Sequence, residues 1–252
     1  METNNPTDHF FSDYDRIKRE RAFHDDQAQA RLHAFSSPDN YLFTDEQYLA
    51  HESWVQTAVL KLGNLKGQRV LDLGCGTGNL TALIAANFPE AEIYALDISP
   101  DILKQCQKRF SNKTNIFYIE QSFEELSFED NYFDLIVSSI AIHHVNDNAK
   151  MNLYKKVNEI LKPGGIFEFA DQTYGATEEI YQTHLNRWKK AAFELGSTQE
   201  NWEMWMEHQK QHDFHSPVLW HIQQLEKYGF VNVDVLWKNI MWLVVYGEKL
   251  IN

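Results

Sequence analysis

Residues 70–79, VLDLGCGTGN, restrict the possible folds of this chain more than any other stretch. An apolar run over 70–73 ends in a turn that contains three glycines, Gly74, Gly76 and Gly78. Glycine loses more backbone freedom on folding than any other residue, so this cluster indicates a tight turn or a close approach of the backbone to another group. A helix expected from Asn79 then directs its amide-rich end at whatever binds there.

Short apolar runs alternate with helical stretches through the middle of the chain. The predicted strands are 70–73, 92–97, 115–119, 133–138 and 165–170, and the predicted helices are 79–88, 100–110 and 148–162. Pro100 directly after Ser99 is a favourable helix start, whereas Lys162-Pro163-Gly164-Gly165 is a helix stop followed by a turn. Such alternation predicts a parallel sheet with helices on both faces.

The last two apolar runs, 231–237 and 240–246, are separated only by Lys238-Asn239, a spacing typical of a hairpin. One of these strands should therefore run antiparallel. The prediction is an α/β fold with a seven-stranded, doubly wound, Rossmann-like sheet that is mostly parallel. Its expected parts are a helical N-terminal cap at 1–66, a cofactor-binding core at 67–173, a helical acceptor cap at 174–228 inserted before the last strands, and a C-terminal hairpin at 229–252.

The composition limits the classes of partner. The chain has 252 residues and a formal net charge of −13, and an acidic surface disfavours nucleic acids and anionic membranes. No apolar run approaches the roughly 20 residues that span a bilayer, and the polar N-terminus is unlike a signal peptide. Cys75 and Cys106 lie in the glycine turn and in a predicted helix, so no disulfide is expected. We expect a cytoplasmic monomer or homodimer that acts on a small molecule.

Two acids indicate the kind of cofactor. Asp97 ends the second predicted strand, where a carboxylate can accept hydrogen bonds from both hydroxyls of a ribose. A dinucleotide site would place its third glycine one position later than Gly78, and Asp72 would repel a pyrophosphate. A cofactor with an amino group would instead be attracted by Asp72. These residues therefore favour a nucleoside cofactor that carries a positive charge.

Four motifs then occur in a characteristic order: VLDLGCGTGN, ALDISPDIL, FDLIVSSIAIHHV and LKPGG. Over residues 66–170 the sequence resembles the class I S-adenosylmethionine-dependent methyltransferases. FHDDQAQAR at 23–31 and YLAHESW at 48–54 resemble the leader of a bacterial subgroup that methylates small molecules. The resemblance implies S-adenosylmethionine as cofactor and S-adenosylhomocysteine as product.

The resemblance also assigns roles to single residues. The implied cofactor-binding residues are Asp72, Gly74, Cys75, Gly76, Gly78, Asn79, Asp97, Ile98, Ser122, Phe123 and Ser139. The turn at 74–78 should face the methionine end of the cofactor, and Ile98 should pack on the adenine. Many members have an Asp for the adenine amino group where this chain has Ser122. A hydroxyl can still accept that hydrogen bond, and the backbone N–H of Phe123 can serve a ring nitrogen.

Catalytic and acceptor-binding residues are sought after the fourth predicted strand and in the caps. His143 or His144 could accept the proton of the acceptor, or one of them could brace the loop. A related group has a Glu-x-x-Glu-His metal triad here, but the run 140–144 lacks both acids, so no metal is predicted. The candidate acceptor-pocket residues are Tyr48, His51, Asp171 and Trp202.

The leading functional interpretation is methyl transfer from S-adenosylmethionine to a small molecule, by in-line attack on the activated methyl group. A carboxy-S-adenosylmethionine synthase has a similar core, but its cap carries an Arg that is missing from MEHQKQHDFHSPV at 206–218. A non-catalytic protein that binds S-adenosylmethionine stays open as an alternative. A nucleic-acid methyltransferase and an NAD-dependent dehydrogenase are disfavoured by the charge and by the glycine spacing.

Overall fold

The computed structural model describes residues 17–19, 21–26 and 65–251. The N-terminal cap expected at 1–66 lies mostly outside these residues; its described parts at 17–19 and 21–26 are helical. No helix in the described ranges is long and apolar enough to cross a membrane.

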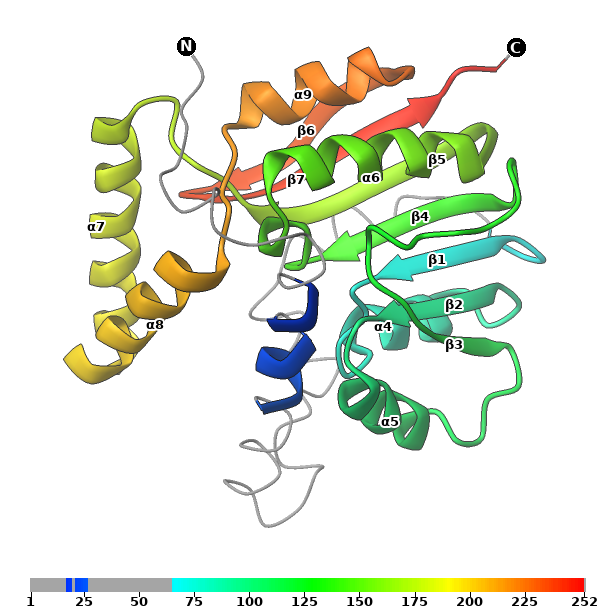
Figure 1. Ribbon diagram of the computed structural model, residues 1–252, viewed down its shortest axis with the longest axis horizontal. Helices are drawn as coiled ribbons and strands as arrows, with labels where there is room; N and C mark the ends of the chain where they lie inside the picture. Colours follow the sequence, from blue (N-terminus) through cyan, green and yellow to red (C-terminus); the bar gives the residue numbers. More distant parts are fainter. Residues whose placement is uncertain (1–16, 20, 27–64, 252) are drawn as a thin grey trace.

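A seven-stranded sheet forms the centre of the molecule, in the order β3-β2-β1-β4-β5-β7-β6 (Figure 1). The strands are β1 (Arg69–Leu73), β2 (Glu92–Asp97), β3 (Ile116–Glu120), β4 (Phe133–Ser139), β5 (Leu161–Gln172), β6 (Phe230–Asn239) and β7 (Trp242–Lys249). The pairs among β1 to β5 are parallel, and β7 runs antiparallel to both β5 and β6. The predicted fold class is thereby confirmed.

Helices cover both faces of this sheet, because successive strand residues point to opposite sides and both sides are apolar. The helices are α4 (Asn79–Asn87), α5 (Pro100–Arg109), α6 (Asp147–Ile160), α7 (Glu178–Glu194), α8 (Gln199–His212) and α9 (Val218–Lys227). Val70 packs with α4 and α5 in one core cluster, whereas its neighbour Leu71 packs with α6 and α9 in the other. Ser99 caps α5 by accepting a hydrogen bond from the Ile102 N–H at 3.1 Å.

Two turns differ from the sequence prediction. The stretch Lys162–Gly165 is part of β5, where it forms an irregularity between the pairs Phe133–Leu161 and Leu135–Ile166. The C-terminal hairpin turns at Ile240-Met241 instead of Lys238-Asn239, because Lys238 and Asn239 still pair with β7.

The switch in strand order lies between β1 and β4, which are neighbours although two strands and two helices separate them in the sequence. In open sheets of this kind, ligands bind beyond the carboxyl ends of the strands at that switch. Figure 1 shows α7 and α8 beyond those ends, together with the helical residues 21–26. The fold thus places three separate parts of the chain around one end of the sheet.

One buried acid of the sheet is electrostatically costly. Glu168 lies in the middle of β5, paired with Val137 and Tyr246, and is only 3% exposed. Among the described residues its Oε2 atom has no hydrogen-bond partner. Burial raises the pKa of Glu168 to about 8. The folded protein therefore favours the protonated carboxyl, whereas the unfolded chain ionises near pH 4.5.

We expect Glu168→Gln to stabilise the protein in a pH-dependent way. Because the folded pKa is raised, the wild type loses stability as the pH rises from the unfolded pKa towards about 8, and the amide does not. The gain in the free energy of unfolding should grow by up to about 3 kcal/mol between pH 5 and pH 8. Urea unfolding at both pH values measures it. Glu226→Gln, at an exposed position, is the control and should not change stability in a pH-dependent way. An equal gain in stability for Glu168→Gln at both pH values would contradict the raised pKa of Glu168.

Candidate active site

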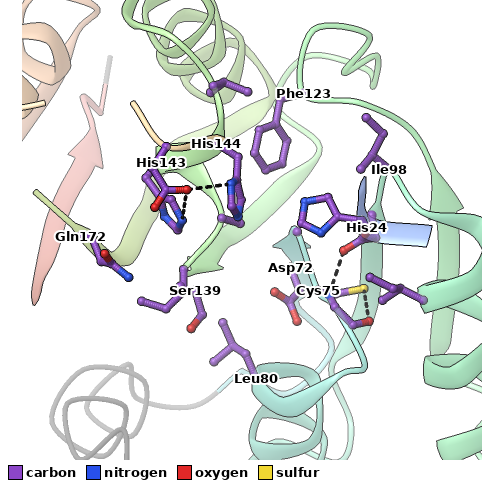
Figure 2. A pocket seen from close by; sticks show the side chains of 18 of the residues that line it. His24, Asp72, Cys75, Leu80, Ile98, Phe123, Ser139, His143, His144 and Gln172 are labelled. Carbon is purple, nitrogen blue, oxygen red and sulfur yellow. Dashed lines mark hydrogen bonds and ion pairs between the residues drawn. The ribbon is translucent and has the colours of Figure 1, made fainter. Parts of the chain in front are cut away.

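A cavity of about 470 Å³ opens beyond the carboxyl ends of β1, β2 and β4 (Figure 2). Its walls come from the glycine turn, the end of β2, the segment after β3, the loop after β4, and helices α7 and α8. The predicted site residues that line it are Asp72, Gly74, Cys75, Gly76, Asn79, Asp97, Ile98, Ser122, Phe123, Ser139, His143 and His144. Tyr48 and His51 lie outside the described residues.

Glycine is required at two positions of the turn by close packing. A Cβ atom on Gly74, which has a φ of +71°, would lie 2.4 Å from the Cβ of Ala141 in the loop after β4. A Cβ on Gly78 would lie 2.6 Å from the Phe110 ring and 2.8 Å from the Cys106 sulfur. Gly78 does not line the cavity itself; it allows α4 to pack on α5, and its predicted contact with the cofactor stays a prediction. Cys75 and Cys106 are free thiols, as expected.

Asp72 is the most deeply buried acid of the cavity, with no exposed surface. Its Oδ2 atom accepts a hydrogen bond of 2.6 Å from the Thr81 hydroxyl, and its Oδ1 atom has no hydrogen-bond partner among the described residues. Burial raises the pKa of Asp72 to about 7, and the charge of Asp97 adds to the shift. A cation that entered the cavity beside Oδ1 would ionise this carboxyl and pair with it.

Asp97 is held by two backbone amides. The Gly76 N–H donates to Oδ2 and the Ser99 N–H donates to Oδ1, each over 2.9 Å. Burial raises the pKa of Asp97 although these hydrogen bonds oppose the shift. Each oxygen keeps further acceptor capacity, so the carboxylate can receive two neighbouring hydroxyls.

In the segment after β3, the Ser122 hydroxyl, expected to accept a hydrogen bond from the adenine amino group, already has partners within the chain. The Ser122 hydroxyl donates to Glu125 Oε2 over 3.0 Å and accepts from the Glu125 N–H over 3.3 Å. Both contacts belong to the local turn. The adjacent Gln121, which also lines the cavity, has a buried Oε1 atom without a hydrogen bond from the described residues. Gln121 is therefore a second polar acceptor here, and it was missed in the sequence.

His143 is fixed from behind by Asp171. The His143 Nδ1 atom lies 2.5 Å from Asp171 Oδ1, and the His143 backbone N–H donates to Asp171 Oδ2 over 2.9 Å. Burial lowers the pKa of His143, but the Asp171 carboxylate outweighs it, so the net shift is upward. Asp171 does not line the cavity itself and lies behind His143, so its predicted place in the acceptor pocket stays a prediction. It orients His143.

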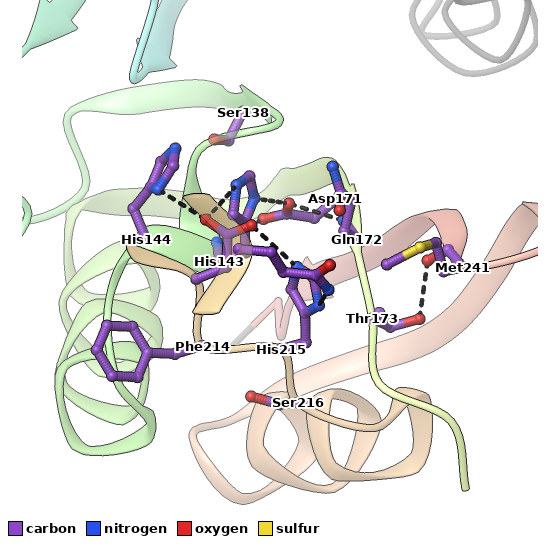
Figure 3. Close-up of polar contacts among 12 residues, drawn as sticks. Ser138, His143, His144, Asp171, Gln172, Thr173, Phe214, His215, Ser216 and Met241 are labelled. Carbon is purple, nitrogen blue, oxygen red and sulfur yellow. Dashed lines mark hydrogen bonds and ion pairs between the residues drawn. The ribbon is translucent and has the colours of Figure 1, made fainter. Parts of the chain in front are cut away.

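The Asp213 carboxylate, directly after α8, faces four histidines, of which Figure 3 labels His143, His144 and His215. Its Oδ1 atom lies 3.4 Å from His144 Nδ1, 3.4 Å from His208 Nε2 and 3.7 Å from His143 Nε2. Its Oδ2 atom lies 3.6 Å from His215 Nε2. Burial disfavours the charge, but His144 and His208 hold the pKa of Asp213 well below its usual range. We did not predict Asp213 from the sequence, although four histidines within residues 208–221 were a signal.

Three tryptophan rings from α8 and β7 surround Trp188 of α7. Its ring lies 5.0 Å from Trp202, 5.7 Å from Trp205 and 5.2 Å from Trp242, measured between centroids. Trp188 and Trp205 line the cavity, whereas Trp202 does not and is only 8% exposed. Trp202 therefore packs behind Trp188, and its predicted role in the acceptor pocket stays a prediction.

Comparisons with known proteins agree with this geometry. Residues 70–165 match the sequence profile of a family described as a methyltransferase domain. A ubiquinone/menaquinone biosynthesis C-methyltransferase of Proteus mirabilis is 33% identical over 141 residues, which are 53% of this chain and 55% of that protein. A demethylmenaquinone methyltransferase of Staphylococcus aureus is 27% identical over 190 residues, 73% of this chain and 77% of the relative. Residues 70–165 therefore match a methyltransferase domain, in agreement with the resemblance seen in the sequence.

Solved structures show the same methyltransferase fold. The YcgJ protein of Bacillus subtilis aligns with a TM-score of 0.62 at 13% identity, over 81% of this chain and all of that one (100%). A phosphoethanolamine N-methyltransferase of Haemonchus contortus, bound to S-adenosylmethionine, aligns with a TM-score of 0.59 at 18% identity, over 84% of this chain and 59% of that one. The chain spans about half the length (55%) of the first curated relative.

We expect the binding of S-adenosylmethionine to this protein to be linked to ionisation of Asp72. The cofactor is cationic, so it favours the ionised carboxyl, whose pKa of about 7 in the free protein is raised by burial. Affinity should fall on the order of tenfold between pH 7.5 and pH 6. Calorimetry in two buffers of different ionisation enthalpy should detect proton release at pH 6.5. Asp72→Asn should abolish this proton release, whereas the exposed control Asp234→Asn should keep it. Proton release by Asp72→Asn equal to that of the wild type would contradict the assignment of the linked proton to Asp72.

Proposed function

We propose that this protein transfers the methyl group of S-adenosylmethionine to a small-molecule acceptor. The observation that carries the proposal is a single cavity, lined at one end by Asp72 and Asp97 and at the other by histidines and tryptophans. The first end suits a cationic nucleoside and the second suits an uncharged acceptor. Because one cavity includes both ends, a donor methyl group and an acceptor atom can meet inside it.

The proposed cofactor contacts follow from the free acceptor atoms of the cavity. The amino group of the methionine moiety pairs with the open Oδ1 atom of Asp72. The two ribose hydroxyls donate to Asp97, and the adenine lies between Ile98 and Phe123, with its amino group near Gln121. None of the described residues that line the cavity is Lys or Arg. This favours a cationic donor over a carboxylated cofactor, which would require a positive partner.

The acceptor end suggests a planar, partly apolar molecule. Trp188 and Trp205 offer aromatic surface, while His143, His144 and Gln209 offer polar groups. One curated relative is named for ubiquinone/menaquinone biosynthesis and the other for demethylmenaquinone. Quinones of this kind are ring compounds with oxygen substituents. We propose an acceptor of that chemical class, an aromatic ring that carries at least one oxygen.

The proposed reaction is one displacement. The electron pair of the acceptor atom forms a bond to the methyl carbon, while the electrons of the sulfur–carbon bond return to sulfur and give S-adenosylhomocysteine. The acceptor also loses a proton to a base. The sulfonium is an activated leaving group, so the protein mainly aligns the two reactants and excludes water. The glycine turn leaves room for the cofactor at Gly76, where a Cβ atom would have no neighbour within 4 Å, while Gly74 lets the loop after β4 pack against the turn.

We expect Asp97→Ala to weaken S-adenosylmethionine binding strongly. A hydrogen bond to a charged partner contributes about 1.5–3 kcal/mol, so the dissociation constant should rise by at least roughly tenfold. Isothermal titration calorimetry with S-adenosylmethionine and S-adenosylhomocysteine measures the effect, and Asp234→Ala is the exposed control. Binding of NAD instead of S-adenosylmethionine by the wild type would overturn the proposed function.

Turnover distinguishes an enzyme from a binding protein. Transfer of radiolabelled methyl groups to a panel of hydroxylated quinols and phenols should give labelled product and equimolar S-adenosylhomocysteine. Tight cofactor binding with no transfer to any member of the panel would favour another acceptor class or a non-catalytic role.

A further inference from the structure

We propose that His143, His144 and Asp213 form a binding site for a divalent transition-metal ion at the acceptor end of the cavity. The three side chains each offer one ligand atom, and these atoms lie within 4.8 Å of one another. All three residues line the cavity, and Figure 2 labels His143 and His144 in its wall. The sequence predicted no metal, because the loop 140–144 has no acid; the acid comes from the end of α8 instead.

The distances fit a shared ion better than hydrogen bonds. Asp213 Oδ1 lies 3.4 Å from His144 Nδ1 and 3.7 Å from His143 Nε2, whereas N–H···O bonds measure about 2.7–3.2 Å. Ligand atoms about 2.0–2.2 Å from one tetrahedral ion lie roughly 3.3–3.6 Å from each other. The two distances from Asp213 Oδ1 are therefore close to those of a coordination shell, and the third ligand pair lies within 4.8 Å.

The partner of His143 fixes the ring in the orientation that a metal requires. When the His143 ring is neutral, the Asp171 carboxylate favours the proton on Nδ1, which leaves the lone pair of Nε2, 3.7 Å from Asp213 Oδ1, for a metal ion. A carboxylate behind a metal-bound histidine is a recurrent arrangement that orients the ring and strengthens the ligand. A lone pair that faces a carboxylate oxygen is unfavourable unless a proton or a cation lies between them.

The Asp213 carboxylate itself needs a positive partner. Its side chain is only 5% exposed, and its Oδ1 atom receives no hydrogen bond of good geometry from the described residues. Burying a charge is costly unless it is paired or coordinates a metal. His208 Nε2 also approaches this oxygen, at 3.4 Å, and so could supply a fourth ligand from α8.

The ligand types define the class of ion. Two imidazoles and one carboxylate suit divalent first-row ions such as Zn²⁺, Fe²⁺ or Mn²⁺, and such sets often leave coordination positions open. Here an open position would face the cavity. This consequence rests on the proposed function: an acceptor hydroxyl bound to the ion would lose its proton more easily, since a Lewis acid lowers its pKa. The two histidines would then hold the ion instead of acting as bases.

The test is metal binding by the tag-free, full-length protein after treatment with a chelator. Titration with Co²⁺ should give visible absorption bands that saturate at one ion per chain, and Zn²⁺ should displace it. His144→Ala and Asp213→Ala should each weaken Zn²⁺ binding at least tenfold. Asp171→Asn should weaken it by about 10–100-fold while the chain stays folded, because only the orientation of His143 is lost.

His184→Ala is the matched control, since it removes a histidine of α7 that does not line the cavity. If the wild type binds Zn²⁺ no more tightly than His144→Ala does, or if His184→Ala weakens binding equally, the metal site is overturned and a proton bridges the cluster. Calorimetry with S-adenosylmethionine on the same samples separates the two proposals. Cofactor binding without metal binding refutes only the metal site, and metal binding without cofactor binding refutes only the proposed function.

Discussion

The contact between the glycine turn and the loop after β4 is the constraint on which the rest of the site depends. Gly74 lies against Ala141 so closely that any side chain would separate them. On its other side the turn is bound to β2, since the amides of Gly74 and Cys75 both donate to the Leu96 carbonyl, over 2.8 and 2.9 Å. One turn thereby fixes three strand ends relative to each other. The carboxylates on one side of the cavity and the histidines on the other keep their separation for this reason.

The cavity also has a distinct distribution of charge. Asp72 and Asp97 are buried near each other, and burial raises the pKa of both. The missing positive charge must come from the ligand. S-adenosylmethionine has a sulfonium and an amino group, whereas S-adenosylhomocysteine has lost the sulfonium. In the proposed reaction the electrostatic attraction therefore decreases on methyl transfer, which favours release of S-adenosylhomocysteine over release of S-adenosylmethionine.

The sequence predicted well whatever depends on neighbouring residues. Strand β1, the start of α4 at Asn79 and the cap at Ser99 follow from local pattern, and the structure confirms them. The sequence did not predict features that depend on the direction of a side chain or on a partner far away in the sequence. Trp202 and Trp205 lie on one helix, yet only the rotation of α8 determines which of them lines the cavity.

The histidine cluster shows the same limit over a longer range. His143 and His144 were recognised as candidates from their position after β4. Asp171 and Asp213, however, reach them from β5 and from the end of α8. No pattern in the sequence pairs these elements, because the contact depends on where α8 ends above the sheet. The prediction of no metal considered only the acids nearby in the sequence.

The position of β7 has a consequence for the order in which the protein forms during synthesis. This strand lies between β5 and β6, so one side of β5 is an unpaired edge until β7 (Trp242–Lys249) has left the ribosome. Strands β1 to β5 can pair earlier, and with them the half of the cavity that contains Asp72 and Asp97. The histidine end needs Asp213 and the Trp188–Trp242 contact, so it is completed last. A nascent chain could thus bind its nucleoside before it can hold an acceptor.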